Sequence, residues 1–384
     1  MSRAPASRPN AFLSYILSSL LRPLKWRPLL SLALLGMVGC AVGASREPIA
    51  VQAAAAPAPS APGPDVKRSE TGEAYVDISV LTYNVKGLPW PLRMDLAEPD
   101  PDIAMVRIGA HLAFLRARGL VPDVVLIQEG FSPAAVLIGE VGGYAFAAVG
   151  PSRIDAEQRP VTADDATLAA GADWTRGEGG GPILDSGLHA FSNYPIKVVA
   201  RSAFGRNACA GYDCLAAKGV LAFAVDVPGV PDPVTFITLH MNANGASGAP
   251  EPRALAAHRL QIDRFARVLE NLDPLTPLIF GGDLNVKTTL SRQQYADQRL
   301  GLAGLTAVHI RCASAAAACD ARYPAANARH WLEPREVQGY RNGRRVHVRP
   351  LASAEMFADP ESGGRLSDHI GYLARYRLSW STSP

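Results

Sequence analysis

Side chains with oxygen or imidazole groups stand at the ends of several predicted strands. In the segment GGDLNV, Asp283 and Asn285 follow the apolar residues 277–280, and residues i and i+2 of a strand face the same side. Taken singly, each such residue is explained by a turn or a helix cap. Their recurrence at separate strand ends favours a functional site instead. The residues concerned are Asn84, Glu129, His240, Asp283, Asn285, Asp368 and His369.

These residue types suit a particular chemistry. Oxygen ligands from Glu, Asp and Asn favour Mg²⁺, Mn²⁺ or Ca²⁺ over zinc. Mg²⁺ keeps several waters and takes one or two carboxylates in proteins, so Glu129 with help from Asn84 suffices as a metal site. A carboxylate of Asp283 or Asp368 would orient His369 for acid–base work near neutral pH. The set predicts hydrolysis of a phosphodiester by water, without a Ser or Cys nucleophile.

The elements that must position these residues alternate along the chain. Apolar residues at helical spacing predict helices at residues 103–119 and 251–272. Strands outnumber helices, so we expect an α/β protein with sheets packed on each other, helices outside and function at one rim. Strands or strand-like runs are predicted at residues 76–85, 122–131, 186–196, 218–227, 233–243 and 277–286, with residues 365–378 closing the chain.

The first forty residues differ in texture from the rest of the 384-residue chain. Positive charges without negative ones precede the apolar run 29–39, which is typical of an export signal and too short to span a bilayer. The segment 37–40 resembles a bacterial lipobox ending in Cys40, whereas residues 42–44 would serve as an ordinary cleavage site. Both alternatives remain open, so the protein is predicted to be exported, either secreted or anchored as a lipoprotein.

Composition divides the chain into three parts. Residues 1–39 are the predicted signal peptide, residues 40–74 an Ala/Pro-rich linker, and residues 75–384 one catalytic domain, expected to be a monomer. Residues 1–39 carry five positive charges, and their removal turns the formal net charge of +3 into −2. The mature protein therefore lacks the global positive charge that favours nucleic acid, although a local basic site is not excluded.

The cysteines beyond residue 40 are even in number, which favours disulfides in an exported chain. Three pairings are formally open, and the two local ones, Cys209–Cys214 and Cys312–Cys319, would each close a small loop. A zinc site is the rival interpretation, but no Cys-x-x-Cys spacing supports it.

Four short motifs resemble those of a known family. TYNVKG, LIQEGF, GGDLNV and SDHIGY, in this order, are similar to the endonuclease/exonuclease/phosphatase (DNase I-like) superfamily, which includes nucleases, inositol polyphosphate phosphatases and neutral sphingomyelinases. The resemblance implies a four-layer α/β sandwich of two packed mixed β-sheets flanked by helices. It also implies roles by motif: Glu129 as metal ligand with Asn84 beside it, Asp283 and Asn285 for water and phosphate, His369 with Asp368 as general-base pair, and His240 for the phosphate or leaving group.

One further motif resembles the neutral sphingomyelinase branch. In DCLAAKGVL, residues 213–221, the resemblance places Lys218 near the substrate phosphate, whereas an ordinary solvated lysine at a strand start is the simpler alternative. Asn242 departs from the branch, which usually has Gln there. The sequence GYRNGRRVHVRP, residues 339–350, predicts a β-hairpin with Asn-Gly at its tip, and its four arginines suit anionic lipid or nucleic acid.

The sequence therefore predicts an exported, metal-dependent phosphoric diester hydrolase with Mg²⁺, or Mn²⁺ or Ca²⁺, as cofactor. Its substrate is predicted to be a membrane phospholipid, as for a sphingomyelinase, rather than nucleic acid. A secreted Mg²⁺-dependent endonuclease on the same scaffold is the first alternative. A surface-tethered binding protein without catalytic activity is the second.

Overall fold

The computed structural model describes most of the expected catalytic domain, and all described residues belong to one compact unit, residues 54–384. The predicted signal, Cys40, Cys312 and Cys319 lie outside the described residues. Those described are residues 63–89, 100–286, 289–308, 320–321 (backbone only) and 336–382.

The first of two mixed sheets has eight strands in the order β11-β13-β14-β2-β3-β5-β4, with β1 paired to β2. The pairs β2–β3 and β11–β13 are parallel, and the others are antiparallel. Its strands are β1 (Lys67–Arg68), β2 (Ala74–Asn84), β3 (Val124–Gln128), β4 (Phe146–Val149), β5 (His189–Ser192), β11 (Asp320–Ala321), β13 (His347–Met356) and β14 (Gly371–Trp380).

The second sheet has six strands in the order β10-β12-β9-β8-β7-β6. Only the central pair β8–β9 is parallel among the described pairs of this sheet. Its strands are β6 (Ile196–Ala203), β7 (Gly219–Val225), β8 (Val234–His240), β9 (Leu278–Asp283), β10 (Thr306–Ala307) and β12 (Glu336–Arg341).

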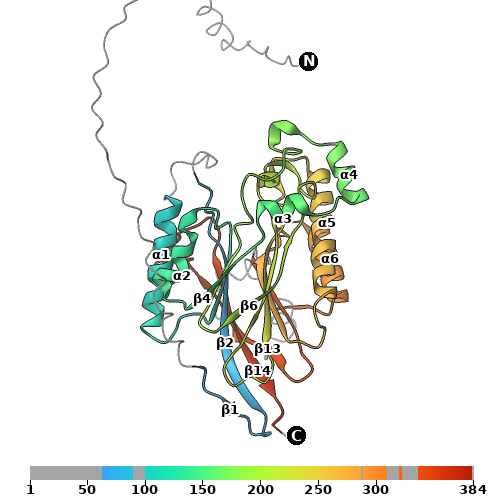
Figure 1. Ribbon diagram of the computed structural model, residues 1–384. Coiled ribbons are helices and arrows are strands. Elements are labelled where there is room, and N and C mark those ends of the chain that lie inside the picture. Colours follow the sequence, from blue (N-terminus) through green and yellow to red (C-terminus); the bar gives the residue numbers. More distant parts are fainter. Residues whose placement is uncertain (1–62, 90–99, 287–288, 309–319, 322–335, 383–384) are drawn as a thin grey trace, which may run out of the picture. The chain divides into compact units, whose positions relative to one another are not determined.

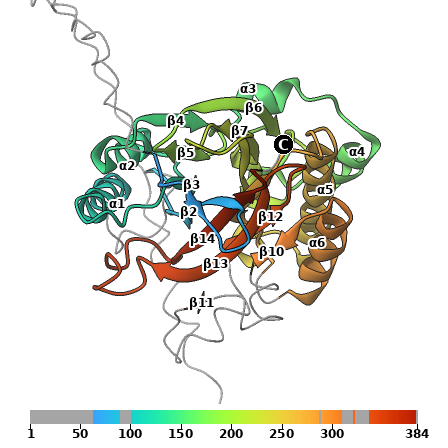
Figure 2. The same ribbon diagram turned by 90° about the horizontal axis from the view of Figure 1, so that it is seen from below.

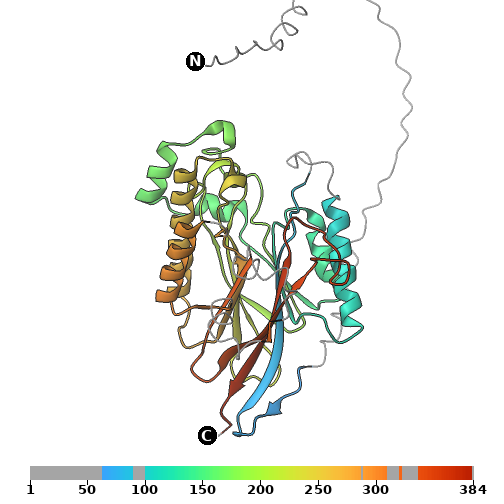
Figure 3. The same cartoon turned by 180° about the vertical axis from the view of Figure 1, so that it is seen from behind.

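Helices cover the outer face of each sheet (Figure 1). Helices α1 (Pro101–Arg116) and α2 (Val136–Gly142) pack on the eight-stranded sheet, and α5 (Glu251–Glu270) and α6 (Leu290–Leu302) on the six-stranded one. The short helices α3 (Arg153–Gln158) and α4 (Ala163–Ala170) contact β6 and α5, respectively. The view along the sandwich and the view from behind show the same four layers (Figures 2 and 3), so the predicted four-layer sandwich is confirmed.

Alternation along the strands explains the layers. In β2, Val76, Ile78 and Val80 join the core between the two sheets, whereas Leu81 and Tyr83 pack under α1 and α2. This period of two is what a strand buried on both faces requires. The helix predicted at residues 103–119 begins slightly earlier, because Asp100 caps it and Pro101 occupies its first turn.

One predicted hairpin and one predicted strand are wrong, because in each segment the chain changes sheet through a short loop. The expected hairpin at residues 339–350 does not form, since β12 pairs with β9 in one sheet and β13 with β14 in the other. The loop 342–346 carries the crossing and is held by a hydrogen bond from Gly343 N to Val346 O of 2.8 Å. Likewise, the strand predicted at residues 186–196 divides into β5 and the start of β6, which belong to different sheets.

The fold also begins before the predicted linker ends. Lys67 and Arg68 pair with Tyr75 and Ala74 of β2, so part of the segment assigned to the linker is a strand. A tight turn closes this pair, with Gly72 at a φ of 83° and its N–H donating to Ser69 O. The strand was missed because its residues are polar and exposed and show no apolar alternation.

Candidate active site

The candidate site lies where the ends of four central strands meet. The parallel pairs β2–β3 and β8–β9 belong to different sheets, and the two sheets are joined near this edge by a 2.9 Å hydrogen bond from Gln128 Nε2 to Thr238 Oγ1. Asn84 is the last residue of β2, His240 of β8 and Asp283 of β9, and Glu129 follows β3 directly. The predicted strand-end residues therefore come together, as parallel pairing requires.

Asn84 joins the two central carboxylates across the sheets. Its Nδ2 donates to Glu129 Oε1 at 2.8 Å and to Asp283 Oδ2 at 3.2 Å, while its Oδ1 accepts from Lys86 N at 3.1 Å. Asn84 is fully buried. The side chain that the sequence places beside Glu129 thus holds that carboxylate in position.

Glu129 fits the role of a metal ligand. Its side chain is 21% exposed, and burial raises its pKa, although Lys218 and His369 oppose that shift. A carboxylate taken partly out of water gains from a nearby cation, and a hard divalent ion supplies one. The described residues contain no group of three or more His, Cys, Asp and Glu that could hold a metal ion. A site of this kind would rely on one or two carboxylates and on water.

The backbone at Glu129 has an unusual conformation, with a φ of 57° in the left-handed region. Non-glycine residues rarely adopt it, and they keep it where surrounding contacts impose it. Gly87 N donates to Glu129 O at 2.8 Å, which ties this turn to the residues that follow β2.

His240 is buried and lies against Lys218. The Lys218 Nζ is 3.0 Å from His240 Nε2, and that ring nitrogen is 3.8 Å from both Glu129 Oε1 and Asp283 Oδ2. Burial, and then the charges of Lys218 and His369, hold the pKa of His240 well below its usual range. The ring is therefore neutral at pH 7, and its Nε2 accepts a hydrogen bond from the lysine.

Lys218 is not an ordinary solvated lysine. It is 6% exposed, its Nζ lies 3.0 Å from Asp213 Oδ1, and it donates to Met241 O at 3.0 Å. The motif that resembles the sphingomyelinase branch thus brings a fixed positive charge to the two carboxylates.

His369 is oriented by a residue that sequence reasoning missed. Its Nδ1 lies 2.5 Å from Glu336 Oε1, and its Nε2 lies 3.9 Å from Asp283 Oδ2. Burial lowers the pKa of His369, but Glu336, Asp283 and Glu129 outweigh it and raise the pKa to about 9. Glu336 is the first residue of β12, opposite Asp283 in an antiparallel pair, so the start of this strand reaches the same edge. The sequence pattern marks only residues at the C-terminal ends of strands, so a residue at the start of β12 was not predicted.

The predicted pair of Asp368 with His369 is not what the structure shows. Asp368 is 42% exposed and its Oδ2 lies 3.8 Å from Lys86 Nζ, while Glu336 occupies the ring nitrogen of His369. The two neighbours diverge because Ser367 fixes the turn, donating to Asn84 O at 2.8 Å and accepting from His369 N at 3.2 Å.

Asn285 forms a tight turn with Asp283. Asn285 N donates to Asp283 Oδ1 at 2.9 Å, its Nδ2 donates to Met241 O at 2.9 Å, and its φ is 51°. The Asx turn considered from sequence is therefore present, and the side chain that forms it also accepts from Asn84. Burial raises the pKa of Asp283, and the charge of His369 opposes that shift.

The comparisons with known proteins agree with this arrangement. Residues 81–355 match the model of the Endonuclease/Exonuclease/phosphatase family. The chain belongs to this family. Its members are typically hydrolases of phosphodiesters or phosphate esters, and the superfamily recognised from the four motifs is thereby confirmed. A comparison with curated proteins gave no match.

Several solved structures are similar to this Endonuclease/Exonuclease/phosphatase protein. A beta toxin of Staphylococcus aureus matches with 14% identity and a TM-score of 0.52, over 77% of this chain and 99% of the toxin chain. Sphingomyelinase C from Streptomyces griseocarneus matches with 18% identity and a TM-score of 0.48, over 78% and 99%. A further beta toxin structure, with bound magnesium ions, matches with 14% identity and a TM-score of 0.47, over 80% and 100%. At these identities the likeness shows the fold alone.

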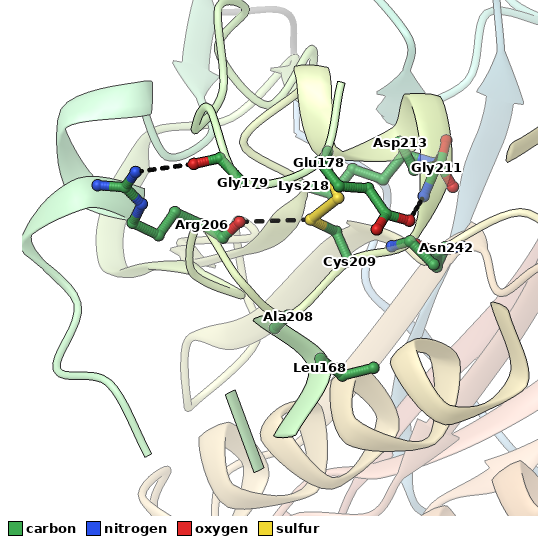
Figure 4. Close-up of a disulfide and its surroundings, with 12 residues drawn as sticks. Leu168, Glu178, Gly179, Arg206, Ala208, Cys209, Gly211, Asp213, Lys218 and Asn242 are labelled. Carbon is green, nitrogen blue, oxygen red and sulfur yellow. Dashed lines mark hydrogen bonds and ion pairs between the residues drawn. A yellow bond between two sulfur atoms is a disulfide. The ribbon is translucent and has the colours of Figure 1, made fainter. Parts of the chain in front are cut away.

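The predicted disulfide Cys209–Cys214 is present in this family member and closes a loop beside the site (Figure 4). Within that loop Gly211 N donates to Glu178 Oε1 at 2.5 Å, and Asp213 supplies the carboxylate that faces Lys218. Asn242, the departure from the sphingomyelinase pattern, is fully buried. It accepts from Ala210 N at 2.8 Å, so it supports the disulfide loop.

Proposed function

We propose that this protein is an exported, Mg²⁺-dependent phosphodiesterase that hydrolyses a membrane phospholipid of the sphingomyelin type. The observation that carries the proposal is the meeting of Glu129, Asp283, His369 and buried Lys218 at one edge of two packed sheets. Lys218 and its motif favour the sphingomyelinase branch, because a fixed positive charge beside carboxylates suits a phosphate diester.

The residues divide the work of hydrolysis between them. Glu336 holds His369 through Nδ1 and leaves Nε2 on the side of Asp283. In its neutral form, which a pKa of about 9 makes the minor form at pH 7, the ring would take the proton of the attacking water as the new oxygen–phosphorus bond forms, so hydrolysis should quicken as the pH rises toward 9. Lys218 would offset the negative charge that grows on the phosphoryl oxygens. The bond between phosphorus and the ester oxygen would break, and that oxygen would leave with the other product after taking a proton from solvent, to which His369 returns its own. Glu129, supported by Asn84, would hold a divalent cation, which polarises the phosphate and lowers the pKa of water.

Export and membrane association rest on the first forty residues. The predicted signal and the predicted lipid attachment at Cys40 both lie outside the described residues. Within the described ranges no helix is both long enough and apolar enough to cross a membrane. We propose that the protein acts as a monomer outside the cytoplasm, secreted or held by a lipid on Cys40.

A paired assay tests the proposal. The purified protein would be incubated with sphingomyelin vesicles and, separately, with plasmid DNA, each with Mg²⁺ and with Glu129→Gln as the matched inactive control. We expect release of the phosphorylated head group and intact plasmid. Plasmid nicking with unchanged lipid would establish the endonuclease alternative, and turnover of neither would favour the binding protein.

A further inference from the structure

Every backbone polar group of the segment that follows His240 is hydrogen-bonded. Residues 241–243 carry three backbone N–H groups and three carbonyls, and each of these groups has a partner within the described structure. In chain order, the three N–H groups donate to Asp283 O, to Gln261 Oε1 and to Asp213 Oδ2. The carbonyl of Met241 accepts from Lys218 and Asn285, and that of Asn242 accepts from Arg292. The carbonyl of Ala243 accepts from Arg292 and from the side chain of Asn242.

Arg292 is the residue that joins this segment to the next site loop. It lies in the first turn of α6 and is fully buried. Its Nη1 donates to Asn242 O at 2.6 Å and to Asn285 O at 3.2 Å, and its Nη2 contacts Ala243 O at 3.3 Å. One planar guanidinium thus binds the loops after β8 and β9 at once, with Nη1 contacting both loops and Nη2 adding a second carbonyl of the first loop.

A buried cation at this position is not explained by helix packing. Ala296 and Leu300, which lie on the same buried face of α6, are apolar. Burial lowers the pKa of Arg292 to about 10, with Asp213 and Glu251 opposing that shift, so the group stays charged at pH 7. Burying a charge costs free energy unless hydrogen bonds offset it. The three carbonyl contacts are the compensation that the structure shows.

The loop after β9 needs such support, because Asn285 adopts left-handed backbone angles. This conformation is unfavourable in a non-glycine residue and persists where the surroundings impose it. His258 Nε2 holds the preceding carbonyl, Leu284 O, at 2.8 Å, and Arg292 holds that of Asn285.

We propose that Arg292 is a positioning residue that fixes the loop carrying His240 relative to the turn carrying Asp283 and Asn285. The inference rests on the proposed phosphodiesterase activity and deepens it. Arg292 touches no substrate in this scheme. It acts through the backbone that sets the distances among His240, Asp283 and Lys218.

The test compares Arg292→Met, which keeps length without charge, with Arg299→Met on the same helix. Arg299 pairs with Asp263 on α5 at 2.7 Å and is the matched control for loss of an α6 arginine. Hydrogen exchange of residues 241–243 and 284–285 should speed up about tenfold or more in Arg292→Met alone. With sphingomyelin, kcat should fall about 10–100-fold while KM changes little.

Arg292→Lys keeps the charge, and it decides the question if Arg292→Met does not fold. We expect it to fold, with faster exchange in at least one of the two loops and a reduced kcat, since lysine ends short of the Nη1 position and lacks the second nitrogen that contacts Ala243 O. A folded variant with wild-type exchange in both loops would overturn the proposal. Faster exchange in a protein that hydrolyses no phosphodiester would instead support the positioning role and refute the proposed function.

Discussion

The two sheets support their shares of the site by different means. At the edge of the six-stranded sheet the supporting groups are charged and largely buried: Lys218 with Asp213, Arg292 with backbone carbonyls, and two arginines of α5 in the pairs Arg253–Glu178 and Arg264–Asp165. At the edge of the eight-stranded sheet the supports are largely uncharged. They are the stacked rings of Tyr83 and Phe357, 4.8 Å apart, and the hydrogen bond from Ser367 to Asn84 O.

This difference predicts on which side of the site the loss of one contact lowers the stability of the protein most. A buried ion pair gives little net stability, but removal of one partner leaves an uncompensated charge. Single substitutions of charged residues on the six-stranded side are therefore expected to lower the free energy of unfolding strongly. On the eight-stranded side the site residues are held mainly by packing, so the expected losses are smaller. The bond from His369 to Glu336 joins the two sides, because β12 belongs to the six-stranded sheet and His369 precedes β14.

The largest effect is expected from Arg264→Met, which breaks a pair whose side chains are 1% and 4% exposed and lie 2.6 Å apart. Asp165 would be left buried without its cation, and the free energy of unfolding should fall by about 3–5 kcal/mol. Urea denaturation measures this loss. The double variant Arg264→Met/Asp165→Leu should recover much of it, and no recovery would show that packing, rather than the orphaned charge, is responsible.

The next effect is a pH dependence from His258 under the six-stranded sheet. Burial, and then Arg292, lower its pKa from 6.5 to about 3. Between these values the unfolded state binds more protons, so stability is present above pH 6.5 and is lost as the pH falls toward 3. The loss from this one group is on the order of 4 kcal/mol. Thermal denaturation over this range should show a shallower decline for His258→Gln, and equal slopes would contradict the assignment.

A smaller effect is expected from Glu336→Gln, which changes the bond between the two sides without removing it. Loss of this carboxylate should lower the pKa of His369 from about 9 toward its ordinary value. NMR titration of the histidine ring measures that shift directly. We also expect hydrolysis to slow by about 10–100-fold, as is usual when the partner of a functional histidine is altered. Asp368→Asn serves as the comparison, and an equal or larger pKa shift there would restore the pair predicted from sequence.

The smallest effect is expected at Arg345, one of the arginines in the segment taken for a basic hairpin. It pairs with Asp232 on the surface, and its side chain is 60% exposed. Exposed pairs contribute little to stability, so Arg345→Ala should leave the midpoint of urea denaturation nearly unchanged. Urea denaturation beside Arg264→Met gives the contrast. A loss of similar size in both variants would remove the distinction between buried and exposed pairs.

Much of the fold and of the site could be predicted from local sequence. Period-two alternation in β2 and the apolar run before Asp283 mark buried strands, and the parallel pairs bring their ends to one edge. Local sequence could not show where the chain changes sheet. Asn342-Gly343 is a hairpin signal, yet β12 pairs with β9 in one sheet and β13 with β14 in the other.

The site residues that the sequence did not predict all reach the site through long-range contacts. Glu336 stands at the start of an antiparallel strand, so it reaches the site edge only through its pairing with β9. Arg292 and His258 lie on helices and act on backbone carbonyls of the strand-end loops. Residues that reach the site through long-range strand pairing or through backbone contacts show no recognisable pattern in the sequence. Side chains at the C-terminal ends of strands can be recognised because each follows an apolar run.

The central claim is that these converging residues hydrolyse a phosphodiester with the help of a divalent cation at Glu129. The most direct measurement is the rate of bis-p-nitrophenyl phosphate cleavage by the wild-type protein and by Glu129→Gln, in Mg²⁺ and after chelation with EDTA. We predict turnover in Mg²⁺ only, and a loss of about 10³-fold in the variant, because the cation supplies several kcal/mol of transition-state stabilisation. Equal rates with and without the metal, or an unimpaired variant, would contradict the account.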